Sequence, residues 1–424
     1  MRRGIAACVV LGLVLRIAFA LLYWTHQPLT RDEREYLALA RSIARGDGFR
    51  YPADEPPAGT GQQFGRAPGY PVFLAVLRVT EPVAHVPRRV QLAQSIVGAI
   101  GVWLIAAIAT RAAGSRAGIA AAAIAAVYPP LVTLPAYALT ETLYSTVALG
   151  AALLLEKRGS RVEHRGSSIG GQLVLDSRPS ILGGLLTGIG ILIRPVMAFF
   201  VPMAVAWMLW RRRPADAAVF LLVAALCVIP WTLRNHRVYG RWIAVASEGG
   251  VTFWTGNHPL ARGDGDLAAN PELKRAELTF RAAHPGLTPE QLEPLYYGDA
   301  LQWIRTHPLQ WTGLLTRKVF YTIVPIGTSY TLHSARYMAA SAVPYLLLLP
   351  AAVAGAWRWR LRRPAGAVSP APLWLMAAAT VAAGLAFLPQ ERFRLPVIDP
   401  ALIVTSALLA GLRRDEPTRR HANV

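Results

Sequence analysis

Residues 4–24 read GIAACVVLGLVLRIAFALLYW, an apolar run in which Arg16 is the one charged residue. A helix needs about 20 such residues to cross the roughly 30 Å hydrocarbon core of a membrane. The run ends in Tyr23 and Trp24, aromatic residues that suit the membrane–water interface. Ala18-Phe19-Ala20 also resembles the cleavage site of a signal peptide. The length of the run and its aromatic end favour a retained first span.

Similar apolar blocks recur along the chain. The sequence is 54% hydrophobic and only 16% charged, whereas soluble domains are about 25% charged. We therefore predict an all-α polytopic membrane protein with about 10 transmembrane helices, within a range of roughly 8–13. The predicted spans are 4–24, 90–110, 117–131, 143–155, 181–193, 196–210, 215–233, 341–357, 371–388 and 396–412.

The net charge of +20 does not indicate a nucleic-acid-binding protein. The arginines cluster at the ends of apolar blocks, as they do in cytoplasmic flanks under the positive-inside rule. The clusters are Arg2–Arg3, Arg211–Arg213, Arg358–Arg363 and Arg413–Arg414. Cys8 and Cys227 lie inside apolar blocks, so no disulfide framework is expected. No P-loop motif occurs, so we expect no ATPase of that type.

This charge distribution predicts one membrane domain, 1–424, with its N-terminus and its tail (413–424) in the cytoplasm. Two long segments, 25–89 and 234–340, then lie outside. Within them, the shorter apolar stretches 69–79 and 309–326 are expected to be interfacial or re-entrant helices. The Gly-, Ser- and Arg-rich segment 156–180 is expected to be a flexible cytoplasmic loop.

The first outer segment contains a helix start. Thr30 and Glu33 match the capping-box pattern, and apolar residues then recur at helical spacing up to Gly46. We predict an amphipathic helix over 31–45 with Asp32 in its first turn. A carboxylate held there at the membrane edge suits a general base. Acids in a first turn also stabilise helices without any catalytic role, and Glu33 could be only a cap.

The segment Arg31–Leu37, followed by Ala40 and Gly46–Phe49, resembles the first outer loop of the GT-C glycosyltransferase superfamily. The resemblance is strongest to bacterial relatives of protein O-mannosyltransferases and of the lipid A aminoarabinose transferase. Further segments match the same pattern in the same order: Arg66–Pro71, Thr140–Tyr144, Ile193–Pro195, Trp254–Asn257 and Pro389–Pro396.

This resemblance implies transfer of a sugar from a polyprenyl-phosphate donor to a hydroxyl group outside the membrane, with inversion. It implies that Asp32 is the catalytic base and Glu33 its acidic neighbour. Positive charge is needed to hold the leaving phosphate, and we assign it to Arg392, Arg394 and Arg194. Alternatively, Arg392 and Arg394 reach lipid headgroups, and Arg194 pairs with Glu141.

The same likeness implies a set of substrate-binding residues, namely Arg66, Tyr70, Glu141, Asn257 and Glu391. A divalent metal ion is possible, but no other cofactor is indicated, and the histidines form no spaced ligand set. The expected partners are the lipid-linked donor, membrane lipids and a glycan, lipid or protein acceptor. The expected location is the inner (plasma) membrane, with the active site on the non-cytoplasmic side.

A transporter or lipid flippase without covalent chemistry is the alternative function. It explains the spans and the membrane arginines equally well. Transporter sites lie near the membrane midplane, however, so it does not explain the acidic, capped helix in the first outer segment. Nor does it explain the length of the second outer segment.

Overall fold

The computed structural model describes residues 2–52, 65–156, 169–265, 270–324, 335–362 and 366–412. Within these ranges every regular element is a helix. The chain begins with α1 (Arg2–Ala18) and η1 (Phe19–Tyr23), which together cover the first predicted span. The next elements belong to the first outer segment: α2 (Arg31–Arg45) and α3 (Gly69–Val76).

The remaining helices follow the predicted pattern closely. Apolar helices lie at α4 (Arg88–Ala113), α5 (Ser115–Val127), α6 (Pro129–Thr133), η2 (Leu134–Ala136), α7 (Glu141–Leu155), α8 (Ile169–Ile193), η3 (Pro195–Phe199), α9 (Phe200–Trp210), α10 (Pro214–Tyr239), α16 (Ala335–Arg362), α17 (Ala371–Ala386) and α19 (Ile398–Gly411). Between them lie α11 (Gly249–Gly256), α12 (Pro271–Ala282), α13 (Pro289–Thr306), α14 (Pro308–Ile323) and the short α18 (Glu391–Arg394).

Within the described residues, four helical stretches are long and apolar enough to cross a membrane: Arg2–Tyr23, Arg88–Ala113, Pro214–Tyr239 and Met338–Arg362. The bent pair Ser115–Val127 and Pro129–Ala136, with a 62° bend, would make a fifth. The same part of the chain contains five shorter apolar helices of 10–17 residues. A helix therefore falls on each predicted range, whereas the count of about ten crossings stays a prediction.

One prediction about a connecting segment is wrong. Residues 156–180 were expected to form a flexible loop, but α8 begins at Ile169 and continues to Ile193. Pro179 lies inside this helix. Residues 157–168 and the tail 413–424 lie outside the described part of the chain.

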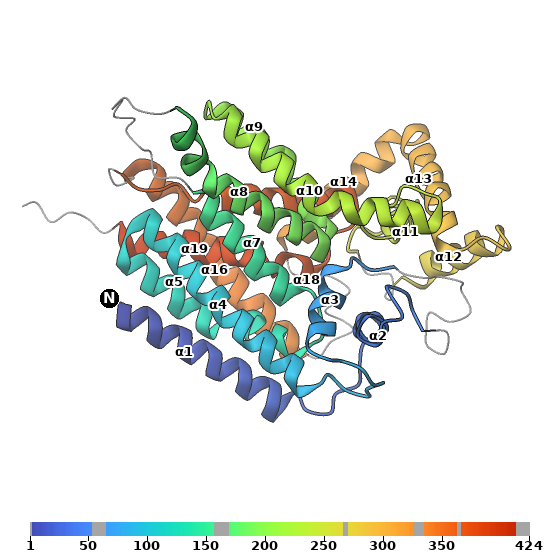
Figure 1. Cartoon of the computed structure of the whole chain (residues 1–424), viewed down its shortest axis with the longest axis horizontal. Coiled ribbons are helices and arrows are strands. Elements are labelled where there is room, and N and C mark those ends of the chain that lie inside the picture. The colour runs from blue at the N-terminus through green and yellow to red at the C-terminus, as the bar shows by residue number, and fades with distance from the viewer. Residues whose placement is uncertain are drawn as a thin grey trace, which may run out of the picture.

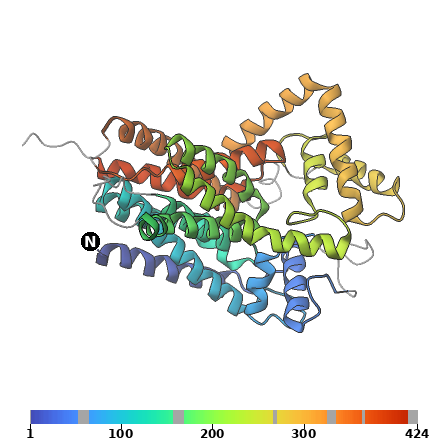
Figure 2. The same ribbon diagram turned by 45° about the horizontal axis from the view of Figure 1, so that its top comes forward.

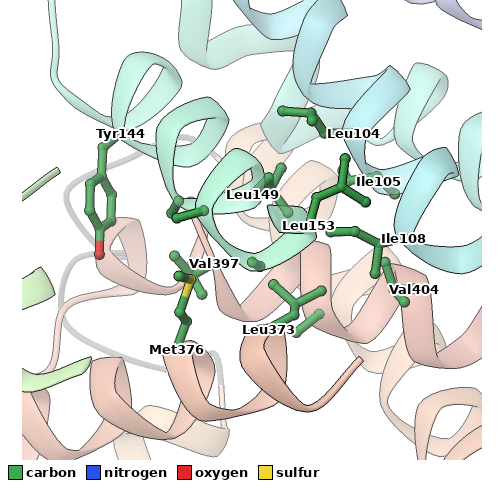
Figure 3. Packing of buried hydrophobic residues seen from close by; sticks show 14 of the residues in the cluster. Leu104, Ile105, Ile108, Tyr144, Leu149, Leu153, Leu373, Met376, Val397 and Val404 are labelled. Carbon is green, nitrogen blue, oxygen red and sulfur yellow. The ribbon is translucent and has the colours of Figure 1, made fainter. Parts of the chain in front are cut away.

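The core of the bundle is built from apolar side chains of several helices. Figure 3 shows Leu104, Ile105 and Ile108 of α4 facing Leu149 and Leu153 of α7, with residues of α17 and α19 beside them. Other large apolar side chains, such as Val10, Leu222 and Leu347, are exposed on the outside of the bundle. Apolar side chains on both the inside and the outside are expected of helices surrounded by lipid.

The helices of the two predicted outer segments gather at one end of the bundle. In Figures 1 and 2, α2, α3 and α11–α13 lie at the end opposite the N-terminus. There α2 packs against α3, and α11 packs against α13. The predicted helices at 69–79 and 309–326 are present as α3 and α14. The fold thus brings two segments distant in sequence to one end of the molecule.

Candidate active site

Helix α2 begins with the predicted capping box. The Thr30 amide donates to Glu33 Oε2 at 2.8 Å, and the Glu33 amide donates to Thr30 Oγ1 at 3.3 Å. Gly46 ends the helix with a positive φ of 87°. The other Glu33 oxygen, Oε1, accepts from the Ala138 amide at 2.9 Å, and only 2% of Glu33 is exposed. Glu33 therefore anchors α2 to the neighbouring loop.

Asp32, the predicted base, lies between two arginines. Its Oδ1 is 2.6 Å from Arg66 Nη2, and its Oδ2 is 2.5 Å from Arg392 Nη1. The side chain keeps 19% of its surface exposed. Burial raises the pKa of Asp32, but the charges of Arg66 and Arg392 outweigh burial and hold it well below its usual range. Asp32 is therefore an ionised, partly accessible carboxylate.

Arg66 also contacts the carboxylates of Glu35 and Glu248. Its Nε donates to Glu35 Oε2 at 2.7 Å, and its Nη1 is 3.2 Å from Glu248 Oε2. Burial lowers the pKa of Arg66, but the surrounding acids raise it well above its usual value. Burial also raises the pKa of Glu248, against the opposing effect of Arg66. Arg66 is thus held firmly, and it fixes one oxygen of Asp32.

Glu35 and Glu248 belong to the site but are not among the residues predicted from the sequence. Glu35 stands three positions after Asp32 on α2, so both project from the same side of the helix. This spacing could have predicted that Glu35 lies beside Asp32 in the site. Glu248 precedes α11 in the second outer segment, and no local pattern marks it. It joins the site only because the fold brings the two outer segments together.

A second ion pair lies next to the first. Arg194 Nη1 is 3.1 Å from Glu141 Oε1, which is the pairing considered as an alternative for Arg194. The Arg194 guanidinium also lies 4.5 Å from the centre of the Phe393 ring, and the Arg392 guanidinium lies 5.5 Å from the same ring. Phe393 thus holds two guanidinium groups, each paired with a carboxylate, beside Asp32.

Arg392 and Arg394 have different surroundings. They belong to α18, which is helical, so their side chains diverge. Arg394 Nη2 donates to Ser341 Oγ at 3.2 Å, and its Nε is 3.3 Å from Asp399 Oδ1. Its side chain is only 5% exposed, whereas that of Arg392 is 37% exposed. The side chain of Glu391 lies outside the described residues.

Two further predicted site residues are buried and do not contact Asp32. The Tyr70 hydroxyl donates to Gln94 Oε1 at 3.0 Å. Asn257 Nδ2 donates to the Ala386 carbonyl at 2.8 Å, and its Oδ1 accepts from Lys318 Nζ at 3.2 Å. These contacts give both residues a role in packing helices together.

Lys318 joins the outer helices to the segment that carries Arg392. Its Nζ donates to the carbonyls of Leu385 and Phe387 at 2.9 and 2.6 Å, in addition to Asn257. Burial lowers the pKa of Lys318 to about 7. These bonds fasten α14 to the end of α17, just before α18.

Gln390 completes the support of Arg392. Its Nε2 donates to the Gly265 carbonyl at 2.8 Å, and its Oε1 accepts from Arg392 Nε at 3.1 Å. The second outer segment therefore helps to orient the guanidinium that faces Asp32. Among the described residues, no three His, Cys, Asp or Glu side chains are arranged to hold a metal ion.

Comparison with solved structures shows which known fold this chain resembles. An oligosaccharyltransferase from Archaeoglobus fulgidus, solved with a tethered acceptor peptide, matches with a TM-score of 0.55 and 12% identity, over 96% of this chain and 49% of that one. The same protein, AglB, bound to an inhibitory peptide and a dolichol-phosphate, matches with a TM-score of 0.52 and 13% identity, over 95% and 50% of the two chains. The chain has the GT-C fold.

The GT-C likeness inferred from the sequence is thus confirmed at the level of the fold. The chain spans about half the length of these archaeal structures. ArnT from Cupriavidus metallidurans, bound to undecaprenyl phosphate, is also similar, with a TM-score of 0.42 and 14% identity, over 96% of this chain and 77% of that one. No protein-family model and no curated protein matches the chain.

Proposed function

We propose that this GT-C chain is a membrane glycosyltransferase. It would move a hexosyl or pentosyl group from a polyprenyl-phosphate donor to a hydroxyl group of a glycan, lipid or protein acceptor. The observation that carries the proposal is the Asp32 carboxylate, partly accessible and bracketed by Arg66 and Arg392. The site would lie at the non-cytoplasmic face of the plasma membrane. The fold supports this proposal, because AglB of the same fold was solved with a dolichol-phosphate.

The guanidinium groups of Arg392 and Arg194 would bind the donor phosphate. Guanidinium groups pair with phosphate through two parallel hydrogen bonds. Arg392 is the more exposed of the two partners of Asp32, with 37% of its side chain exposed against 17% for Arg66. We infer that Arg392 exchanges Asp32 for the phosphate when the donor binds. The departure of one cation would raise the pKa of Asp32.

In the transfer step, the bond between the anomeric carbon and the phosphate oxygen breaks. Its electron pair leaves with the polyprenyl phosphate, whose charge Arg392 and Arg194 stabilise. The acceptor oxygen forms the new bond on the opposite face of the sugar, so the configuration inverts. The hydroxyl proton passes to Asp32.

A carboxylate of low pKa is adequate for this role. The anomeric carbon becomes cationic in transition states of this kind, so it attracts even a neutral hydroxyl group. The hydroxyl becomes acidic only as the new bond forms, and its proton is then transferred to a weak base. Arg66, held by Glu35 and Glu248, would keep Asp32 in place while Arg392 is engaged with the phosphate.

The test uses the full chain in lipid nanodiscs with labelled polyprenyl-phosphate sugars and acceptors extracted from the cell envelope. Asp32→Asn should lower transfer by about 10²-fold or more, because the amide accepts no proton. Asp216→Asn is the matched control, because Asp216 in the first turn of α10 pairs with Arg213 and should keep wild-type transfer. Equal rates for Asp32→Asn and the wild type would refute the assignment of the base.

A further inference from the structure

Arg16 is buried in α1, within the first predicted span, and 1% of it is exposed. Its Nη1 donates to the Gly12 carbonyl at 2.8 Å, and its Nη2 donates to the Ala125 carbonyl at 3.3 Å. Its Nε is buried without a hydrogen-bond partner. Among the residues that the structure describes, no acidic side chain forms an ion pair with Arg16. The guanidinium charge therefore lacks a protein counter-charge.

A small cavity of about 20 Å³ adjoins this arginine. Arg16 and Gly98 of α4 both line it, and a Cβ built on Gly98 would lie 2.9 Å from Arg16 Nε, so this nitrogen packs closely against Gly98. Thr142 of α7 lines it too, and its Oγ1 is also buried without a partner. Three helices thus bring a charged N–H group, a hydroxyl group and an empty volume together.

The size and charge of this cavity define its ligand. A volume of roughly 10–15 Å³ holds one water-sized particle, so about 20 Å³ leaves no room for a sugar or a phosphate group. A charged side chain in the apolar part of a membrane protein is costly unless it is paired. An anion compensates this charge, whereas a water molecule does not. We propose that Arg16 and Thr142 bind a single monovalent anion the size of chloride.

The proposed anion site lies close to the proposed active site, and its role there would be to hold helices together. Thr142 directly follows Glu141, which pairs with Arg194. The cavity lies at the first turns of α7, and the N-terminal end of a helix favours negative charge. A bound anion would fasten α1 to α7 beneath Glu141. This inference concerns stability, so it stands or falls independently of the proposed transfer reaction.

Thermal unfolding of the purified full chain tests the proposal, with sodium chloride compared with sodium gluconate at equal ionic strength. A ligand that binds only the folded state raises its stability in a saturable manner. We expect chloride and bromide to raise the Tm of the wild type by roughly 2 °C or more. A structure determined with bromide should show an anomalous signal within hydrogen-bond distance of Arg16 Nε. Equal melting in both salts and a water molecule at this position would overturn the proposal.

Variants separate this site from general effects of salt. Thr142→Val keeps the shape of the side chain but removes the hydroxyl group, so the response to chloride should weaken. Arg16→Gln should abolish it. Arg89→Gln is the control, because Arg89 binds the Arg78 carbonyl at an exposed position and should keep the wild-type response. A wild-type response in Thr142→Val and Arg16→Gln would place the anion elsewhere and refute the site.

Discussion

Arg392 and Arg394 lie two positions apart in the short helix α18, and the helical backbone points their side chains in different directions. Both were expected to serve the donor phosphate, and an extended segment would have placed them on one face. Because Glu391–Arg394 is helical, Arg392 reaches Asp32 while Arg394 reaches Ser341 and Asp399. The two arginines should therefore respond differently to the same substitution.

Lysine substitution at each position tests this difference. Arg392→Lys keeps a charge but loses the two-pronged guanidinium, so we expect the KM for the polyprenyl-phosphate sugar to rise roughly tenfold. Arg394→Lys should lower the Tm, because the single Nζ of a lysine cannot reproduce the separate Nη2 and Nε contacts with Ser341 and Asp399. Steady-state transfer and thermal unfolding measure the two effects. An unchanged KM in Arg392→Lys would remove this residue from the phosphate site.

Helix α2 was predicted well from the sequence because its signals are local. Thr30, Glu33 and Gly46 mark its ends, and the observed helix covers the predicted range 31–45. The contacts of its acids could not be predicted in the same way. Glu33 bonds Ala138, and Asp32 pairs with Arg392, through contacts that depend on the whole fold. The apolar helices could be predicted equally well, because a run of apolar residues is also a local pattern. No local pattern around Glu248 or Lys318 predicts their contacts.

The junction between α11, α14 and α17 depends on one lysine. Lys318 is buried and donates to Asn257, Leu385 and Phe387. Because burial lowers its pKa to about 7, the folded chain releases this proton near neutral pH, while the unfolded chain retains it until about pH 10. The unfolded chain thus binds more protons between these values, so the lysine makes stability increase with pH in that window.

Comparison with Lys318→Met isolates this contribution. We expect the change in Tm between pH 6 and pH 9 to be more positive for the wild type than for the variant. Lys274→Met is the control, because Lys274, paired with Glu277, keeps 41% of its side chain exposed. An identical pH response in wild type and Lys318→Met would show that Lys318 keeps its proton throughout this range.

At the scale of the whole molecule, both predicted outer segments lie at the end opposite the N-terminus (Figure 2). Reporter fusions test which side of the membrane that end faces. A fusion in the turn at Gly286, between α12 and α13, should report a non-cytoplasmic position. A fusion after Arg213, between α9 and α10, should report the cytoplasm. A cytoplasmic signal at Gly286 would reverse the assigned sidedness and place the site on the wrong face for the proposed reaction.

The pairing of Asp32 with Arg392 also has a consequence for biosynthesis. The ribosome makes Asp32 long before Arg392, which emerges only after most of the helices have been made. Until then, the carboxylate lacks one of its two cations. A chain released before α18 would carry Asp32 and Arg194 but not Arg392. Under the proposed function, such incomplete translation products should therefore be inert toward the lipid-linked sugar.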